Sequence, residues 1–338
     1  MSGPGTGRPI RLGILSLAHH HAEGYLGTGR VPGVDLVGLW DEDGPRGADA
    51  AAAHGMRAFA TEADLLAAGV DGVIVCSVSS EHRRLVELAA AAGVHVLCEK
   101  PLATRVEDAR AILAACTAAD VRLMTAFPMR FSPVLRALHA SVGSGAVGEL
   151  VCLEGANTGE MPDVHRAWFV DPVLAGGGAV MDHVVHLADL YRWLLDDEVV
   201  EVYAVTNRIL QDGFAGVETG GFVSLRFSRG VIATIDCSWS KPRSYPTWGG
   251  LALEVVGTKG VVTSDAFRQH LVVHGHPDAG ISWPFWGSDP NAAMLAEFGS
   301  AIREGREAAV TGLDGLRALE IVEAAYRSAG SGVPVQLR

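Results

Sequence analysis

The chain has 338 residues and is 49% hydrophobic, which is enough for about two domains with hydrophobic cores. Its 27 basic and 39 acidic residues give a net charge of −12. This acidic balance argues against a nucleic-acid partner, because phosphate binding needs a basic surface.

Five cysteines are scattered without CxxC spacing, at Cys76, Cys98, Cys116, Cys152 and Cys237. We expect free thiols, most of them buried, and neither disulfides nor zinc ligands. Residues 1–9 lack an apolar run and are expected to form a flexible tail, not a signal peptide. No apolar stretch reaches the length of a membrane span, so we expect a cytoplasmic protein without a membrane partner.

From residue 10 to residue 128, strand-like and helical patterns alternate. Strands are expected at 10–17, 34–40, 56–60, 73–77, 95–98 and 122–125, and helices at 18–26, 48–54, 81–92 and 105–119. This alternation predicts parallel βαβ units in a doubly wound, Rossmann-type sheet, and therefore a dinucleotide-binding domain.

The turn after the first strand reads SLAHHH and departs from the GxGxxG pattern of dinucleotide sites. Ser16, Ala18 and His21 occupy the three glycine positions. Small residues at the first two leave room for a diphosphate group, and His19, His20 or His21 could contact phosphate or substrate. No metal site is expected here, because consecutive residues of a helix point to different faces.

Asp41 follows the second strand, where an acidic residue accepts hydrogen bonds from the adenosine ribose and repels a 2′-phosphate. It favours NAD as the cofactor. Arg46 is close enough in sequence to leave NADP open, and Asp41 could also be a helix-entry residue of its turn.

The stretch 94–101, VHVLCEKP, combines a short buried strand with a charged pair. Glu99 and Lys100 stand at the end of the strand, and Pro101 holds them in a turn. Ligands of open α/β sheets bind at the carboxyl ends of the strands, so Lys100 is well placed for chemistry. The alternative is an exposed ion pair of little energetic value.

A second polar group lies in residues 176–195, GGGAVMDHVVHLADLYRWLL. Three glycines precede a helical pattern in which Asp182 and His186, one turn apart, share a face, while His183 is expected to point elsewhere. The carboxylate could orient the imidazole or the substrate. The alternatives are an ordinary helix N-terminal acid with a polar-face histidine, or a metal site that includes Asp189.

The alternation of strands and helices stops after residue 128, and residues 129–338 are expected to form a second domain. Strands are expected at 150–157, 199–208, 221–227, 231–239, 251–256 and 260–264, with helices at 132–141, 291–303 and 313–328. They predict an α+β domain with a large, open, mostly antiparallel sheet. Helices would cover one face of this sheet, and the other face could meet a second subunit.

Together these motifs resemble the glucose-fructose oxidoreductase / inositol dehydrogenase family, abbreviated Gfo/Idh/MocA. HVLCEKPLA is similar to its signature loop and places Lys100 at the catalytic lysine. GGGAVMDHVVHLADL is similar to its GGGALxDxGxHxxD motif and places Asp182 and His186 at the catalytic pair.

Two further stretches extend the resemblance over nearly the whole chain. SVSSEH, residues 77–82, is similar to the family's TPNxxH segment, although Val78 replaces its proline and Ser79 its asparagine. Residues 311–337 resemble its closing helix and tail, so the last helix, about 312–329, is expected to pack back toward the N-terminal domain. The glycine loop is the departure from the family's pattern.

The resemblance implies an NAD(P)-dependent oxidoreductase that acts on a secondary hydroxyl of a sugar, cyclitol or related polyol. Cofactor contacts are then expected from the first turn, from Asp41 and from Ser77, Ser79, His82, Glu99 and Lys100. The substrate pocket could be lined by Arg130, His165, Arg166 and Trp168. A homodimer or homotetramer formed through the C-terminal sheet is expected.

Two other functions share these residues. One is elimination or glycoside cleavage through transient oxidation by NAD, which needs the same lysine, aspartate and histidine. The other is that the protein is a non-catalytic family member. Only the departure of the turn SLAHHH from the glycine pattern favours this alternative.

Overall fold

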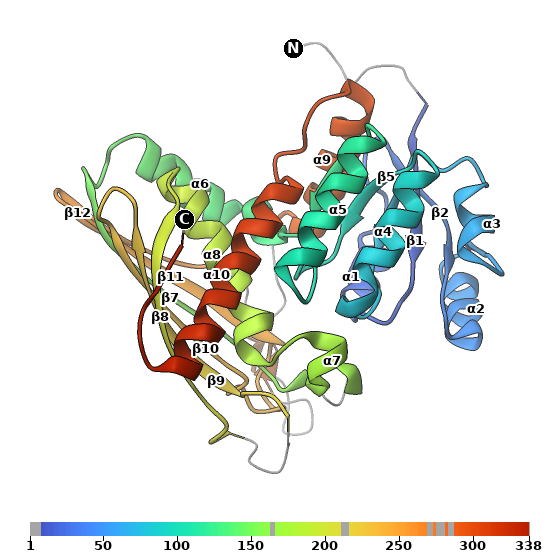
Figure 1. Cartoon of the computed structure of the whole chain (residues 1–338). Coiled ribbons are helices and arrows are strands. Elements are labelled where there is room, and N and C mark those ends of the chain that lie inside the picture. The colour runs from blue at the N-terminus through green and yellow to red at the C-terminus, as the bar shows by residue number, and fades with distance from the viewer. Residues whose placement is uncertain are drawn as a thin grey trace.

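The computed structural model describes residues 8–162, 166–210, 216–268, 273–274, 281–282 and 287–337. Figure 1 shows two sheets, each with helices packed against it, and helix α10 (Gly312–Ser331) running between them. Among the described residues, no helix is long and apolar enough to cross a membrane. All five cysteines are free thiols, as expected, and all but Cys152 are buried.

The first sheet is the doubly wound sheet that the sequence predicts. Its strands, all parallel, are β1 (Ile10–Leu15), β2 (Val34–Trp40), β3 (Arg57–Ala58), β4 (Gly72–Val75), β5 (His95–Cys98) and β6 (Leu123–Thr125). They are ordered β3-β2-β1-β4-β5-β6. The order reverses direction between β1 and β4, and ligands of such sheets bind at this switch point.

Five helices connect these strands: α1 (His21–Gly27), α2 (Gly44–Ala53), α3 (Glu62–Leu66), α4 (His82–Ala91) and α5 (Val106–Ala118). Asp43 caps α2 and Thr61 caps α3, each accepting a backbone N–H of the first turn. Helix α1 begins at His21 and not at Ala18 as expected, so the two preceding histidines lie in the turn.

The second sheet is mostly antiparallel, also as predicted. Its strands are β7 (Leu150–Gly159), β8 (Val199–Asn207), β9 (Gly220–Phe227), β10 (Ile232–Ser238), β11 (Gly249–Gly257), β12 (Gly260–Asp265) and β15 (Val335–Gln336). They are ordered β12-β11-β7-β10-β9-β8-β15, and only β7 and β10 pair in parallel. A separate short pair joins β13 (Val273–His274) to β14 (Ile281–Ser282).

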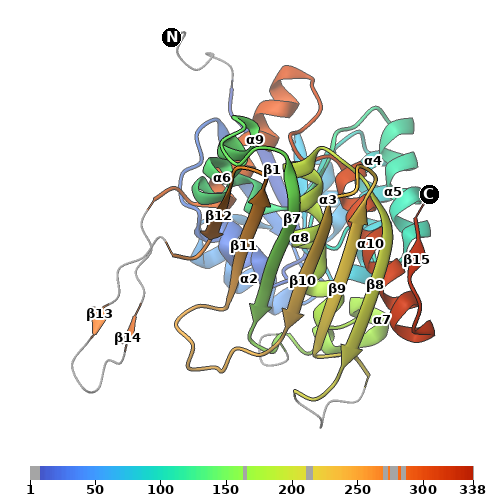
Figure 2. The same ribbon diagram turned by 90° about the vertical axis from the view of Figure 1, so that its left-hand side faces the viewer.

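Helices cover only one face of this second sheet. Helix α8 (Ala179–Leu195) packs on β7, β9 and β10, and α10 packs on β8. Alternate residues such as Ala233, Ile235 and Cys237 are buried against them. Figure 2 shows the other face, turned to the viewer, with no helix over it.

Two helices of the C-terminal half reach the first sheet. Helix α10 packs on α5 and β6, and α9 (Pro290–Glu304) packs on β1 and β2. The contact of α9 with these strands is not among our expectations. Both helices therefore connect the second half of the chain to the first sheet. Helix α6 (Pro133–Gly143), in contrast, packs on strand β12 of the second sheet.

Candidate active site

Lys100, directly after β5, forms an ion pair with Asp182 in the first turn of α8. The Lys100 Nζ lies 2.7 Å from Asp182 Oδ1, and the two residues are 2% and 8% exposed. Asp182 Oδ2 also accepts the Trp239 Nε1–H at 3.1 Å. Burial alone would raise the pKa of Asp182, but the Lys100 ammonium and the surrounding donors hold it far below its usual value. The pair is therefore a buried ammonium held by a permanent carboxylate.

Helix α8 places Asp182 because its N-terminus is fixed from outside the helix. The buried carboxylate of Glu218 accepts the backbone N–H groups of Gly178 and Val180. A Cβ at Gly178 would collide with the Glu218 carbonyl oxygen, and one at Gly177 with the Tyr326 hydroxyl. These two glycines are thus needed for close packing at the helix start.

Glu99, which is expected to contact the cofactor, binds groups of the protein itself. Its carboxylate is buried and accepts the Lys100 backbone N–H at 3.0 Å, the Tyr25 hydroxyl, and the His21 Nδ1–H at 3.2 Å. Burial raises its pKa, but the neighbouring His21 and Lys100 lower it by more, so that the net pKa is lowered. Glu99 therefore links the β5 turn to helix α1.

His82 also differs from its expected role as a cofactor contact. It is fully buried, and its Nδ1–H donates to the carbonyl oxygen of Pro101 at 2.9 Å. The Lys100–Pro101 peptide bond is cis. His82 supports the turn that carries Lys100 and does not face solvent.

The expected pairing of Asp182 with His186 is not present, and His183 takes that place. His183 Nε2 lies 3.5 Å from Asp182 Oδ2, although the sequence pattern predicts that His183 points elsewhere. His186 Nδ1 is buried without a hydrogen-bond partner. Burial and then the Lys100 charge lower the pKa of His186 well below 6.5, so its imidazole is neutral at pH 7.

These side chains surround a cavity of about 100 Å³, which we call the catalytic cavity. Lys100, Asp182, His183 and His186 form its polar side. His20 and His21 reach it from the first turn, and the remaining wall includes Met129, Asn157, Trp248, Leu251 and Phe267. One charged pair beside the imidazoles of His183 and His186 suits a small polar ligand that accepts and donates hydrogen bonds.

On the other side of Lys100 and Asp182 lies a second cavity of only about 10 Å³, which we call the closed cavity. Ser79, Pro101 and the glycines before α8 line it, together with Trp168 and Phe169 of the short helix η4 (Ala167–Val170). The Trp168 Nε1–H and the Arg166 Nε–H both donate to the carbonyl oxygen of Ala18, at 3.0 and 3.1 Å. Helix η4 is thereby fastened over the first turn.

The first turn itself keeps part of a dinucleotide site. Ser16 has a φ of +72°, the left-handed conformation that glycine usually supplies. Ala18 is buried and small. Asp41 stands at the end of β2 as expected, but its oxygens already accept the Leu17 N–H and two N–H groups of Arg46, the closest at 2.7 Å. Arg46 would have to move aside for a ribose to reach Asp41.

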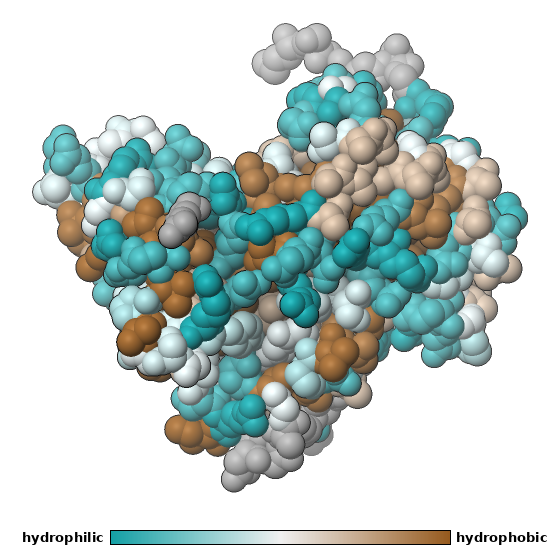
Figure 3. Space-filling model, in the orientation of Figure 1, coloured by the Kyte–Doolittle hydropathy of each residue, from teal (hydrophilic) through white to brown (hydrophobic). Residues whose placement is uncertain are grey.

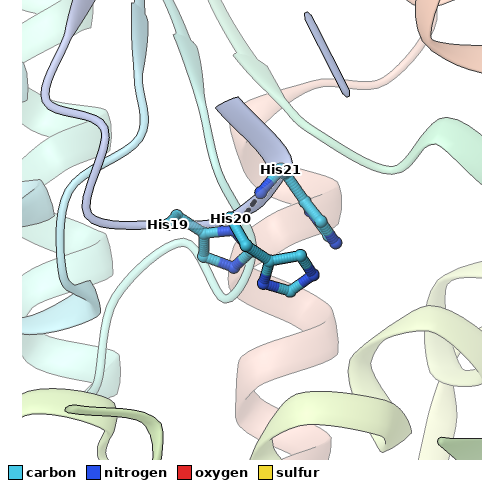
Figure 4. Close-up of side chains that lie close together, drawn as sticks. All are labelled: His19, His20 and His21. Carbon is cyan, nitrogen blue, oxygen red and sulfur yellow. Dashed lines mark hydrogen bonds between the residues drawn. The ribbon is translucent and has the colours of Figure 1, made fainter. Parts of the chain in front are cut away.

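The sequence analysis placed all three histidines in one helix and concluded that they could not bind the same metal ion. That argument is wrong. His19 and His20 precede α1, and one ring nitrogen from each of His19, His20 and His21 lies within 4.8 Å of the others. Figure 4 shows the three rings grouped at the start of the helix.

The residues expected to line the substrate pocket are placed differently. Arg130 donates to Asp189 at 2.8 Å and to Asp314 at 3.0 Å, and this buried network joins α8 and α10. It is therefore structural, as is Asp189, which the metal alternative included. Arg166 and Trp168 bind the first turn, and His165 lies outside the described residues.

Of the two serines that are expected to contact the cofactor, Ser79 lines the closed cavity, whereas the Ser77 hydroxyl donates to the Val78 carbonyl oxygen.

The sequence reasoning missed Tyr25, His183 and Trp239. Tyr25 follows His21 by one helical turn, so helix spacing could have shown that the two side chains lie on one face. Trp239 directly follows the distant strand β10, and no sequence pattern connects it with Asp182.

Comparison with known proteins places this chain in a family. Residues 10–127 match the model described as an oxidoreductase family with an NAD-binding Rossmann fold, and residues 135–263 match the GFO/IDH/MocA C-terminal domain. The chain belongs to the GFO/IDH/MocA oxidoreductase family. It is thus an oxidoreductase with an NAD-binding domain, and the resemblance seen in the sequence is confirmed.

Relatives in the GFO/IDH/MocA family cover almost the full chain. A D-apiose dehydrogenase of Paraburkholderia graminis is 32% identical over 98% of this chain and 89% of its own. An inositol 2-dehydrogenase of Rhizobium meliloti is 30% identical over 90% of this chain and 96% of its own. The structure of GenD2 from gentamicin A biosynthesis, in complex with NAD, superposes with a TM-score of 0.88 at 27% identity and covers 100% of this chain and 99% of that one.

Proposed function

We propose that this family member transfers a hydride between NAD and a secondary hydroxyl of a sugar, cyclitol or related polyol. The buried Lys100–Asp182 pair beside His186, at the wall of the catalytic cavity, carries the proposal. The names of the relatives support the substrate class, since the dehydrogenases among them act on apiose and inositol.

The three polar residues have separate tasks in this reaction. Lys100 donates a hydrogen bond to the substrate oxygen and stabilises the negative charge that develops on it. His186 is neutral, and one ring nitrogen accepts the hydroxyl proton. Asp182 keeps the Lys100 ammonium in place through their 2.7 Å ion pair. NAD supplies the acceptor for the hydride that leaves the carbon.

The cofactor would lie along the carboxyl ends of β1, β2 and β4. Ser16 and Ala18 leave space at the first turn, Ser79 and Lys100 lie beside the closed cavity, and Asp41 would bind the adenosine ribose. The carboxylate of Asp41 favours NAD over NADP, because it repels a 2′-phosphate.

The test measures the turnover of a panel of polyols, with NADH formation monitored by its absorbance. Lys100→Ala and His186→Ala should each lower kcat by on the order of 10²–10⁴-fold, because each removes a group that acts only in the transition state, and NAD affinity should stay nearly unchanged. The matched controls are Lys259→Ala and His54→Ala, at exposed turns of the chain. Normal turnover in either active-site variant would refute these roles. Release of an aglycone without net NADH would indicate the elimination reaction.

We further propose a cytoplasmic homodimer or homotetramer. Five free thiols suit a reducing compartment. The uncovered face of the second sheet carries exposed apolar side chains, namely Tyr203, Val205, Phe222 and Ile232, which we call the open-face patch. Figure 3, which views the molecule from the side, shows apolar residues in the region of this sheet. Apolar patches of this kind are typical of subunit interfaces.

A further inference from the structure

The three histidines of the first turn form the only group of three or more potential metal ligands among the residues that the structure describes. They are consecutive in sequence, and their ligand atoms converge because His19 and His20 lie in the turn before α1 while His21 opens the helix. Figure 4 shows these rings side by side at the start of α1.

His19 is the innermost of the three. It is 1% exposed, and its Nε2 has no hydrogen-bond partner. The Phe169 ring packs edge-on at 5.1 Å between centroids, and the Trp168 ring lies at 5.8 Å. A buried polar nitrogen without a partner, in an apolar surrounding, is costly unless something binds it.

His21 is oriented by a carboxylate in the way that metal-binding histidines usually are. Its Nδ1 lies 3.2 Å from Glu99 Oε1, and because the carboxylate only accepts, Nδ1 carries the proton. The Nε2 lone pair is then available to a ligand. Such carboxylate–histidine pairs fix the tautomer and increase the basicity of the coordinating nitrogen.

We propose that His19, His20 and His21 bind one transition-metal ion of the Zn²⁺ and Co²⁺ type, with an open coordination position toward the catalytic cavity. Imidazole nitrogens suit these ions and not Mg²⁺ or Ca²⁺. Three protein ligands with one open position are the arrangement of catalytic zinc sites. Because His20 and His21 also line the catalytic cavity, the open position faces the space beside Lys100 and Asp182.

Binding requires two small adjustments. Ring nitrogens up to 4.8 Å apart must approach, since metal–nitrogen bonds are about 2.0–2.1 Å long. His19 must also release the 3.2 Å contact in which its Nδ1 accepts the His21 N–H, because a ring that coordinates through one nitrogen carries its proton on the other. Positive charge at this turn is compatible with a dinucleotide, whose diphosphate is anionic.

The experiment uses the full chain without a polyhistidine tag, freed of metal with a chelator and titrated with Zn²⁺ by calorimetry and with Co²⁺ by visible absorption. Wild type should bind one equivalent with a micromolar or lower Kd. His20→Ala should weaken binding by on the order of 100-fold, because it removes a direct ligand. His54→Ala, which removes an exposed imidazole at the end of α2, should bind as wild type does.

His20→Cys supplies a readout that folding defects cannot imitate. A thiolate at this position should restore Co²⁺ binding and add a sulfur-to-cobalt charge-transfer band, which shows direct contact between residue 20 and the ion. The proposal is overturned if wild type binds no ion, if His20→Ala binds with unchanged affinity, or if His20→Cys binds Co²⁺ without that band. None of these results depends on NAD binding or on turnover.

Discussion

At the residue scale, the site is governed by which groups keep their charge after burial. Asp182 stays ionised because the Lys100 ammonium lies 2.7 Å away. His186 is half-buried beside the same ammonium and stays neutral because desolvation and that charge lower its pKa. One buried cation thus lowers the pKa of both its neighbours. The result is a fixed donor next to an imidazole that can accept a proton.

The lowered pKa of His186 has a direct consequence for pH dependence. A base works only when deprotonated, and His186 is deprotonated at every pH above its lowered pKa. The acid limb of kcat/KM for polyol oxidation should therefore lie below pH 6.5, with little change between about pH 6.5 and 8. The measurement is kcat/KM across this range with saturating NAD. An acid limb at or above pH 6.5 would contradict the neutral imidazole.

Sequence spacing predicted Lys100, Asp182 and His186 but not the contacts among them. The i, i+4 argument paired Asp182 with His186, whereas the Asp182 carboxylate turns toward Lys100 and Trp239, and His183 comes closer than His186 does. The partners of the buried Asp182 carboxylate lie directly after β5 and β10, and a helical pattern carries no information about other elements. His82 and Arg130 were misassigned for the same reason.

At the element scale, η4 covers Lys100 on the side of the closed cavity. Trp168 and Phe169 leave a cavity of about 10 Å³ there, which is room for no more than a water molecule. If the nicotinamide ring of NAD approaches Lys100 from this side, helix η4 has to move. The two donors from Arg166 and Trp168 to the Ala18 carbonyl oxygen are the contacts that would break.

Removing the Trp168 ring should make NAD binding tighter. The closed arrangement lowers the population that is competent to bind, so Trp168→Ala should lower the Kd for NAD by on the order of 10-fold. The measurement is calorimetric titration with NAD. The matched variant Trp168→Phe retains one aromatic ring while it loses the indole N–H and part of the ring surface, so it should change the Kd much less. Weaker binding by Trp168→Ala would show that the ring supports the bound cofactor.

Element boundaries explain the other errors of prediction. Helix α1 starts at His21 and not at Ala18, and this shift of the start brings His19 and His20 together with His21. The doubly wound sheet was predictable because each strand and helix has its own local pattern. The packing of α9 on β1 and β2 was not predictable, because the amphipathic pattern of a helix does not indicate which sheet the helix packs on.

At the scale of the whole molecule, two sheets share one buried contact region but only the first is covered on both faces. In Figure 1, α10 runs between the sheets, and in Figure 2 the second sheet leaves its outer face uncovered. The open-face patch therefore remains in contact with solvent in a single chain. An antiparallel sheet can have one solvated face, but that face is then normally polar.

A charge in the open-face patch should dissociate the proposed oligomer. Phe222 is 47% exposed on β9 at the middle of the patch, and Phe222→Glu would place carboxylates against each other or against apolar side chains of the partner. We expect wild type to be a dimer or tetramer by light scattering and this variant to be smaller. Val173→Glu, on the short helix α7 (Pro172–Ala175) and 75% exposed, is the control that should not change the mass. A monomeric wild type would contradict the interface.

The central claim is that a first turn without the glycine pattern still serves an NAD-dependent site, and nucleotide binding by the whole protein tests it most directly. Calorimetric titration of the wild-type chain should give a micromolar Kd for NAD and weaker binding of NADP, because Asp41 repels a 2′-phosphate. If a folded preparation binds neither nucleotide, Lys100, Asp182 and His186 do not form a dehydrogenase site, and the proposed function is wrong.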